Sequence, residues 1–452
     1  MDIDTLWNNY HATTIAAYHP HFPEEVLTLH PSDASWITSR IKRLYFQRNY
    51  AFYTHDGALY RRLRNKLIRD IKVAKKDHYP SKIHRLKESN SSLWYHKIKS
   101  LCGLTSKPSP LPFLDFTDPT DIATAINQHF TNICTQFPPL DASSLPSFLP
   151  ASSPPPTVTE IQVYKKLCSF RTNRSVTPLD LPMALTKEFA LELAKPLCII
   201  VNASIQQGKS PSQWKDSFVS PVPKIPTPLA LGDLRPITLT QLASLLCESF
   251  VAEWMYNDIS TKIDLQQYGN VRGSSTTLCL IDFLNFIYEE LEKRKTAVTA
   301  TFIDFKKAFD LVDHNIVIKK AIALGVRECI IPWIADFLSG RRQSVRYLGA
   351  MSDFLPTTCG VPQGTILGSL CFLVLINDAL LDTSLRWKYV DDCTFAISIN
   401  TDSPDHAPLQ QTLDTLQQWS DSNHMSINPS KTVVLNFSVS ITPLPPPFPY
   451  PW

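Results

Sequence analysis

Apolar residues recur at helical spacing in three stretches of the chain. Residues 121–134 carry them on one helical face, directly after a proline-containing start signal at residues 118–120. Residues 159–169 and 185–207 show the same periodicity. Residues 218–223 instead alternate in polarity and contain two prolines, which predicts a strand at the edge of a sheet.

One strand pattern ends at an acidic residue. Residues 297–303 are rich in β-branched side chains and alternate in polarity, so we predict a strand that delivers Asp304 at its C-terminal end. Residues 306–320 then take on helical character. An acid at the end of a strand is held in a defined position by the sheet.

A second strand pattern forms a hairpin with two acids at its tip. Residues 385–390 and 393–398 predict the two strands, and Asp391 and Asp392 lie between them. The segment 360–365, GVPQGT, precedes this hairpin and enters a strongly apolar helix. Adjacent carboxylates repel each other, and a surface turn more often uses Asp-Gly or Asn-Gly.

Proline-rich segments divide the chain, whose 452 residues are enough for two or three domains. Residues 137–156 contain seven prolines among Ser and Ala, which predicts an extended linker without a core of its own. The last eleven residues contain six prolines and predict a disordered tail. A hydrophobic content of 44% excludes disorder of the whole chain.

The charge is small overall but unevenly distributed. The formal net charge is +3, yet residues 36–107 hold 18 Lys and Arg against four Asp and Glu, a local net charge of +14, with many aromatic residues among them. We predict a long basic helix or a helical pair that contacts nucleic acid; the alternative is a solvated surface helix. The residues expected to bind nucleic acid are Arg40, Lys42, Arg43, Arg61, Arg62, Arg64 and Lys66.

The cysteines and the N-terminal residues indicate in which cellular compartment the protein is expected. The ten cysteines form no C-x-x-C pair and lie in apolar stretches, which is typical of reduced, buried thiols. The first residues are acidic, unlike a signal peptide, and the longest apolar run is too short to span a bilayer. We expect an intracellular protein of the nucleus or cytoplasm, neither secreted nor bound to a membrane.

The three acids suggest metal-dependent chemistry. Hard cations such as Mg²⁺ take oxygen ligands, and a pair of them held by a few carboxylates can assist phosphoryl transfer. Asp304, Asp391 and Asp392 would supply these ligands. Each pattern alone is more often an ordinary turn or cap, so their order along the chain carries the weight.

That order resembles the reverse transcriptases of non-LTR (LINE-type) retrotransposons. The sequence FIDFKKAFDLVDH at residues 302–314 resembles motif A, GVPQGTILG at 360–368 resembles motif B, and YVDD at 389–392 resembles motif C. Residues 419–437 resemble motif D. The fingers motifs and the segment before motif A are matched by residues 221–224, 234–239 and 267–277, so the resemblance covers about residues 161–437.

The resemblance implies an α+β right-hand polymerase with an antiparallel palm sheet backed by helices. The implied domains are an N-terminal extension (1–35), a basic helical connector (36–107), a short helix and proline-rich linker (108–156), fingers (157–296), palm (297–440) and a proline-rich tail (441–452). The implied enzyme is an RNA-directed DNA polymerase, a nucleotidyltransferase whose partners are an RNA template, a DNA primer and dNTPs.

The resemblance also assigns roles to single residues. Asp304 and Asp391, assisted by Asp392, would bind two Mg²⁺ ions, with Mn²⁺ as an alternative ion, and Lys431 would protonate the leaving pyrophosphate. The expected dNTP-binding residues are Lys224 and Arg235 at the triphosphate, Phe309 beneath the sugar as a gate against ribonucleotides, and Gln363 and Gly364 in the nucleotide pocket. Without the resemblance, Phe309 is equally well explained as a core residue and Lys431 as a solvated lysine.

Two alternatives to an active reverse transcriptase follow from the same residues. No primer-grip hairpin, thumb or endonuclease is expected in this chain, so it resembles a partial copy and would be a catalytically silent remnant that still binds nucleic acid. An RNA-dependent RNA polymerase is disfavoured, because such enzymes typically have Gly-Asp-Asp in motif C and no aromatic gate.

Overall fold

The computed structural model describes residues 1–22, 36–89, 111, 118–141, 143, 145–146, 153–172 and 175–439, without the side chains of residues 77–89. The chain divides into two compact units: residues 1–15 with 113–452, called the main unit here, and residues 16–112. The predicted tail, residues 90–107 of the basic segment and much of the proline-rich linker lie outside the described residues.

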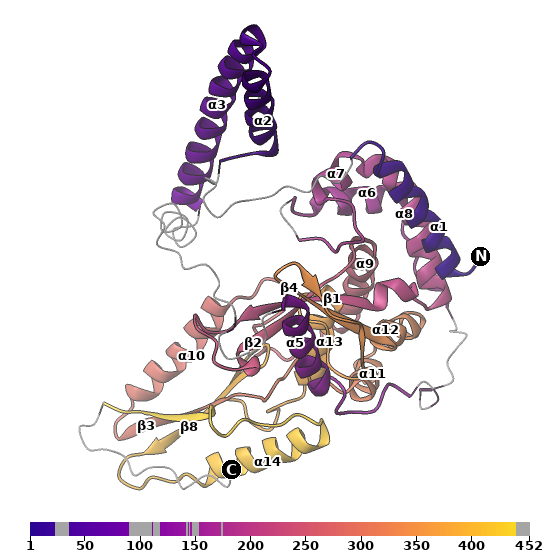
Figure 1. Cartoon of the computed structure of the whole chain (residues 1–452). Helices are drawn as coiled ribbons and strands as arrows, with labels where there is room; N and C mark the ends of the chain where they lie inside the picture. Colours follow the sequence, from indigo (N-terminus) through magenta and orange to yellow (C-terminus); the bar gives the residue numbers. More distant parts are fainter. Residues whose placement is uncertain are drawn as a thin grey trace. The chain divides into compact units, whose positions relative to one another are not determined.

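Helices make up about half of the described chain (Figure 1). Their bounds are α1 Ile3–Tyr18, α2 Ser39–Tyr53, α3 Gly57–Ser89, α5 Pro119–Ile133, α6 Glu160–Ser169, α7 Met183–Glu188, α8 Ala190–Gln207, α9 Leu242–Ile259, α10 Thr276–Leu291, α11 His314–Ala323, α12 Ile331–Leu338, α13 Ile366–Ile376 and α14 Ala407–Ser422. Short 3₁₀ turns occupy Ser212–Lys215, Leu231–Asp233 and Glu328–Ile330. None of the described helices is long and apolar enough to cross a membrane.

The strands form two sheets, both in the main unit. Their bounds are β1 Asp216–Pro223, β2 Leu234–Leu239, β3 Thr296–Ile303, β4 Arg341–Tyr347, β5 Ala350–Met351, β6 Leu355–Thr357, β7 Arg386–Tyr389, β8 Asp392–Asn400 and β9 Val433–Phe437. The first sheet has the order β2-β1-β4-β5, with β6 also paired to β4, and the second has the order β7-β8-β3-β9. All pairs are antiparallel except β1 with β4.

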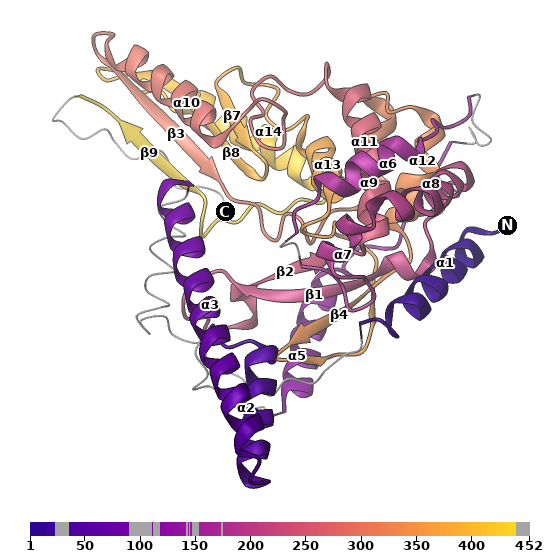
Figure 2. The same cartoon turned by 90° about the horizontal axis from the view of Figure 1, so that it is seen from above.

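The predicted edge strand is central, which corrects the sequence-based expectation. β1 pairs with β2 over Phe218 to Pro223 and with β4 over Asp216 to Val219. Its prolines, Pro221 and Pro223, lie beyond the part that β4 covers, so their missing N–H groups cost no hydrogen bond on that side. In Figure 2, α5 lies along β4 on this sheet.

The four-stranded sheet is covered on both faces. On one face lies α10 (Figure 1), whose Phe283 and Ile287 pack against Val298 and Ala300 of β3. On the other face, residues of β8 such as Phe395 belong to the large core that also includes α9, α11, α13 and α14. Because strand side chains alternate between faces and both faces are covered, β3 is buried almost throughout, whereas β8 is buried at four of its nine positions.

Helix starts follow the local sequence signals. α5 begins with Asp118 as N-cap and proline in its first turn, and α6 begins with a full capping box between Thr159 and Gln162. The stretch predicted as one helix over 185–207 is instead α7 and α8, separated at Phe189. These helices otherwise confirm the periodicity seen in the sequence.

The helix predicted over residues 306–320 is wrong over residues 306–313 and confirmed from His314 onward. The structure has turns up to Asp313 and starts α11 at His314. The carbonyls of Phe309 and Val312 accept hydrogen bonds from the backbone of Val361 and Gly360, both 2.8 Å, instead of from their own helix. Residues 305–313 are therefore held by a distant loop that no local pattern contains.

Residues outside the predicted fingers and palm also take part in the units. Ile3 and Trp7 of α1 are buried in the core of the main unit, although the sequence predicts only an extension there. The five-stranded sheet takes β1 and β2 from the predicted fingers range and β4 to β6 from the predicted palm range. The division by residue ranges remains a prediction.

The second unit contains a helical hairpin of α2 and α3, called the basic hairpin here. Ile41 and Leu44 of α2 and Leu67 of α3 form its small core. The predicted basic helix or helical pair is confirmed as a pair over the described residues. Its turn lies at Thr54 to Asp56.

Candidate polymerase active site

The sheet places Asp304 directly at the end of β3, in the middle of four strands. β3 runs between β8 and β9, so the backbone before Asp304 is hydrogen-bonded on both sides. Asn428 holds the acid from the segment before β9. The side-chain amide of Asn428 donates to Asp304 Oδ2 at 2.7 Å, and its backbone N–H donates to the Asp304 carbonyl at 2.7 Å.

Strand register brings the other two acids to the same end of the sheet. Ile303 pairs with Cys393, so the next residue of β3, Asp304, lies beside the start of β8, where Asp392 is found. Asp391 occupies the turn between β7 and β8. Sequence positions almost 90 residues apart are therefore joined by one antiparallel pairing.

The charges of these acids conflict with one another. Burial raises the pKa of Asp391, and the neighbouring carboxylates of Asp392 and Asp304 raise it further, while Arg235 partly offsets them. Partial burial and the charge of Asp304 raise the pKa of Asp392 in the same way. A divalent cation among oxygen ligands would relieve this repulsion.

The donor set therefore suits a hard divalent cation, which takes carboxylate oxygens and water. Members of the reverse transcriptase family generally use divalent metal ions, and the acids present here fit that use. Within the described ranges, no three His, Cys, Asp or Glu side chains already converge on one point. Asp304 and Asp391 are the residues that would hold the ion.

A cavity of about 720 Å³ lies in front of these acids and gathers most of the site residues expected from the sequence. Asp304 and Asp391 form part of its wall together with Lys224, Arg235, Phe309, Gln363 and Lys431. These residues come from the position directly after β1, from β2, the turns after β3, the loop before α13, the turn between β7 and β8, and the segment before β9. Asp392 and Gly364 lie outside its lining.

The cationic side of the cavity is crowded with positive charge. The pKa of Lys224 is lowered by burial and by the neighbouring charges of Lys307, Lys431 and Arg235, although Asp310 raises it. Lys224 Nζ donates to the Gly232 carbonyl at 2.9 Å. Several cations that repel one another in a cavity form a site suited to a polyanion.

Phe309 and Gln363 are held in place by neighbours. The ring of Phe309 stacks on Phe372 of α13 with centroids 4.5 Å apart, so it is anchored in the core and also lines the cavity. Gln363 Nε2 donates to Asp310 Oδ1 at 2.7 Å, and its carbonyl accepts from the N–H of Thr238 in β2 at 2.8 Å.

Gly364 lies where two backbones approach. Its φ is +104°, and a Cβ there would lie 3.2 Å from the carbonyl oxygen of Thr238. A side chain would therefore strain the backbone and push the loop before α13 away from β2. Gly364 shapes the cavity through its backbone rather than by lining it.

Sequence reasoning missed Asp310, Asn428 and Lys307, all of which line the cavity. Asp310 lies in the segment matched to motif A, and burial raises the pKa of its carboxyl while the Gln363 amide lowers it. Its position six residues after Asp304 was the available signal. Asn428 offered no signal of its own, since its role depends on a contact with residue 304.

The expected nucleic-acid-binding residues all lie on the basic hairpin. Arg40, Lys42 and Arg43 are on α2, and Arg61, Arg62, Arg64 and Lys66 are on α3. Six of them are exposed and Lys42 is half-buried. Arg40 also pairs with Asp70 of α3 at 3.0 Å, which joins the two helices.

Comparison with known proteins identifies the fold that carries this cavity. Residues 222–444 match the family described as reverse transcriptase (RNA-dependent DNA polymerase). Residues 222–444 form a reverse transcriptase domain. The resemblance to non-LTR enzymes and the α+β polymerase fold expected from the sequence are thereby confirmed.

The curated relatives come from mobile elements of insects. The chain is 27% identical over 254 residues to the RNA-directed DNA polymerase from mobile element jockey of Drosophila melanogaster, covering 54% of this chain and 28% of that protein. It is 29% identical over 256 residues to the probable RNA-directed DNA polymerase from transposon BS of the same species, covering 52% and 27%. This reverse transcriptase chain thus spans about a quarter of the length of these relatives.

Among solved structures, telomerase from Candida tropicalis is similar to this reverse transcriptase. It aligns with a TM-score of 0.38 and 14% identity, covering 50% of this chain and 42% of the telomerase chain.

Proposed function

We propose that this domain is an RNA-directed DNA polymerase that transfers a nucleotidyl group from a dNTP to the 3′-hydroxyl of a DNA primer on an RNA template. The observation that carries the proposal is the cavity itself. Its lining brings the acids Asp304 and Asp391 together with the cations Lys224, Arg235 and Lys431. A triphosphate with its reacting phosphorus beside the acids, and its other oxygens at the cations, matches this set of charges.

The acids are the proposed metal ligands. Asp304 and Asp391 would hold two Mg²⁺ ions with the assistance of Asp392, and Mn²⁺ is the alternative ion. Bound ions of this kind lower the pKa of the attacking hydroxyl and offset the charge of the leaving pyrophosphate. Asn428 orients the Asp304 carboxylate through its 2.7 Å hydrogen bond.

The cations and the aromatic ring are proposed to bind and select the nucleotide. Arg235 and Lys224 contact triphosphate oxygens, and Lys431, which is exposed at the cavity, protonates the leaving pyrophosphate. Phe309, fixed by its stacking on Phe372, excludes a ribose 2′-hydroxyl. Gln363 and Gly364 shape the nucleotide pocket.

Primer extension by the full chain tests this function. The purified protein is given poly(rA)·oligo(dT), dTTP and Mg²⁺, and is compared with Asp391→Ala and with the exposed-acid control Asp414→Ala on α14. We expect extension by the wild type and by Asp414→Ala only. Extension by the wild type that does not exceed that of Asp391→Ala would overturn the proposal.

Phe309→Ala tests the proposed gate in the same assay. Its expected effect is a rise of at least tenfold in incorporation of ribonucleotides relative to deoxynucleotides, because the 2′-hydroxyl no longer meets the ring. Unchanged discrimination together with normal extension would remove the gate from the mechanism.

We propose a nucleic-acid-binding function for the basic hairpin, which would remain in a chain without polymerase activity. Phe46, Tyr50 and Tyr53 are exposed and lie within one face of α2 by their helical spacing, beside basic residues. Exposed rings among cations suit single strands, on which bases stack. Because the proposed RNA template and DNA primer are found inside the cell, we propose that the protein is located in the nucleus or the cytoplasm.

Binding of labelled single-stranded RNA at several salt concentrations tests the hairpin. Replacing Arg61, Arg62 and Arg64 by Ala removes three phosphate contacts, and we expect weaker binding with a shallower dependence on salt. Phe46→Ala with Tyr50→Ala should reduce affinity for single strands more than for duplex. Equal binding by all variants would show that this hairpin is a solvated surface.

A further inference from the structure

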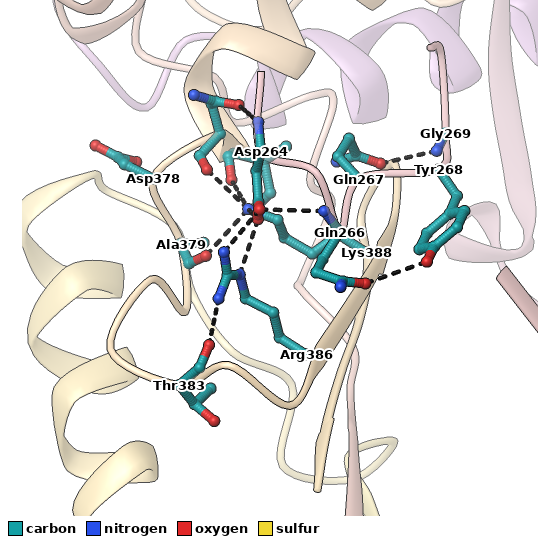
Figure 3. A network of polar contacts seen from close by, with 12 residues as sticks. Asp264, Gln266, Gln267, Tyr268, Gly269, Asp378, Ala379, Thr383, Arg386 and Lys388 are labelled. Atoms are coloured by element: carbon teal, nitrogen blue, oxygen red, sulfur yellow. Dashed lines mark hydrogen bonds and ion pairs between the residues drawn. The ribbon is translucent and has the colours of Figure 1, made fainter. Parts of the chain in front are cut away.

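A fully buried lysine lies three residues before Asp391. The side chain of Lys388 in β7 is 0% exposed, and its amine is surrounded by oxygen atoms (Figure 3). Nζ lies 2.7 Å from Asp264 Oδ2 and donates to the carbonyls of Ile376 at 3.2 Å, Asn377 at 2.7 Å and Ala379 at 3.1 Å. An ammonium group is rarely so completely enclosed unless every proton has an acceptor.

Asp264 is the centre of the same network. Its side chain is 2% exposed and also receives Arg386, whose Nε and Nη2 lie 2.9 and 2.7 Å from its two oxygens. The Asp264 backbone N–H donates to Asn377 Oδ1 at 2.9 Å. Burial raises the pKa of Asp264, but the hydrogen bond from Arg386 and the charge of Lys388 outweigh it and lower the pKa to about 2.

The network joins two motifs of the site. The carbonyls of Ile376 and Asn377 belong to the C-terminal end of α13, where helix carbonyls lack partners within the helix. α13 begins directly after the loop that carries Gln363 and Gly364. Lys388 thus ties the end of that helix to the strand that leads to Asp391, and a positive charge at a helix C-terminus is favourable.

Backbone contacts extend the same connection to the hairpin tip. The segment after Asp264 pairs with β7: Lys388 N–H donates to the Gln266 carbonyl, and Tyr268 N–H donates to the Lys388 carbonyl, both at 2.8 Å. Gln267 Oε1 then accepts from the N–H groups of Gly269 at 2.8 Å and Val390 at 3.2 Å. Gln267 itself is buried.

The tip needs this support because its backbone is strained. Val390, the residue before Asp391, has a φ of +61°, which a β-branched residue rarely adopts. Gly269 approaches it so closely that a Cβ would lie 2.4 Å from the Val390 nitrogen. Such a conformation persists only when surrounding contacts fix it.

We propose that Lys388, Asp264 and Gln267 are positioning residues that hold the hairpin tip so that Asp391 presents its carboxylate toward Asp304. They touch no reacting atom; they act through Val390 and Asp391. This inference rests on the proposed polymerase function, since it assigns Asp391 to the metal site.

A purely structural role is the competing explanation. Replacing a buried ion pair by apolar side chains is often neutral or stabilising, whereas removing one partner is strongly destabilising. The double variant Asp264→Asn with Lys388→Met removes both charges of that pair and separates the two roles. The control is the matched double variant Asp336→Asn with Lys215→Met, because these two residues form an ion pair at 2.8 Å away from the hairpin.

The experiment measures Mn²⁺ binding to the full chain by electron paramagnetic resonance, with thermal unfolding and primer extension alongside. Mn²⁺ at the candidate site is the Mn²⁺ that the wild type binds and the Asp391→Ala variant does not bind. We expect the double variant to unfold within a few degrees of the wild type but to bind Mn²⁺ at this site at least tenfold more weakly. The control double variant Asp336→Asn with Lys215→Met should bind Mn²⁺ as the wild type does.

Gln267→Leu provides a second route that leaves both charges in place. We expect it too to weaken Mn²⁺ binding at least tenfold, and to lower kcat more than it changes the KM for dTTP. A double variant that folds and binds Mn²⁺ normally, or a folded Gln267→Leu protein that does so, overturns the positioning role.

The remaining outcomes separate this inference from the proposed function. If the double variant does not fold, Gln267→Leu decides alone. Mn²⁺ binding without primer extension by the wild type overturns the polymerase function but leaves the positioning role to be decided by affinity. A wild type that loses no Mn²⁺ binding on Asp391→Ala overturns both.

Discussion

Asp264 and Asp391 both lie at the short β7–β8 hairpin, but the charged groups around the two carboxylates have opposite signs. Asp264 is buried behind β7 and faces two cations, Arg386 and Lys388. Asp391 lies at the tip, where burial raises its pKa and the acids Asp392 and Asp304 beside it raise it further. One carboxylate stabilises the folded chain, while the other is held in an unfavourable electrostatic position. The difference separates an acid that positions from an acid proposed to react.

The largest effect is expected from removing the carboxylate of Asp391, whose nearest charged neighbours are mainly acidic. Asp391→Asn should slow primer extension at least a thousandfold, about 4 kcal/mol in the barrier, because a metal ligand is lost. In EDTA the same variant should be more stable than the wild type at neutral pH, since a carboxylate with unfavourable neighbours is gone.

The pH dependence of unfolding in EDTA checks the sign. A raised pKa means that the folded chain binds the proton more tightly, so the contribution of Asp391 to stability falls as pH rises from its ordinary value through its raised value. Asp391→Asn should lack this contribution. A variant that is less stable than the wild type at neutral pH would contradict the comparison.

The second largest effect is expected from removing Arg386, one of the two cations that pair with Asp264. Arg386→Leu removes the two hydrogen bonds to Asp264 and leaves a buried carboxylate with Lys388 alone. We expect a loss of about 4 kcal/mol in the free energy of unfolding, measured by urea denaturation. A loss below about 1 kcal/mol would mean that Lys388 suffices to compensate Asp264.

Glu248 provides an intermediate case between these two acids. It is fully buried in α9 and accepts hydrogen bonds from Ser244 Oγ at 3.2 Å and from Leu367 N–H at 3.5 Å, at the start of α13. Burial raises its pKa to about 7, although the charge of Arg341 and these hydrogen bonds oppose the shift. It is therefore only partly compensated.

Glu248→Gln should stabilise the chain by roughly 3 kcal/mol above pH 7 and leave it unchanged below about pH 4.5. Between these values the unfolded wild-type chain releases its proton before the folded chain does, so wild-type stability falls as pH rises. Urea denaturation across this range measures the difference. A constant difference at all pH values would show that the glutamate does not titrate there.

The smallest effect is expected at an exposed pair. Arg342 donates to both oxygens of Asp216 at 2.8 Å, the same fork geometry as Arg386 with Asp264, but the arginine is largely exposed. Arg342→Leu should cost less than about 1 kcal/mol of unfolding free energy. A cost equal to that of Arg386→Leu would show that burial does not decide the strength of these pairs.

The sequence predicted those parts of the site that depend on local pattern. Residues 297–303 alternate as a strand must, so Asp304 was found at its end, and the two acids between strands predicted the hairpin of β7 and β8. The apolar helix after Gly364 also matches α13. In each case the periodicity and the key residue lie within about ten positions.

The remaining parts depend on contacts between distant positions. β1 is central because β4, more than 100 residues later, pairs with it. The network around Lys388 depends on Asp264, which lies more than 100 residues earlier in the chain. The only local signal for this network was a lysine within a predicted strand, next to Trp387. Likewise, Asn428 gained its role through a hydrogen bond to Asp304. No local pattern contains such pairs.

The cavity also constrains when the site can form during synthesis. Its lining begins at Lys224 and ends at Lys431, so the wall is complete only after about 200 further residues have left the ribosome. At 5 to 20 residues per second this takes about 10 to 40 s. During that interval β1 and β2 can pair as a local hairpin, but β3 waits for β8 and β9. The nascent chain thus exposes an apolar strand until motif C arrives, and this interval is when chaperone binding would have most effect.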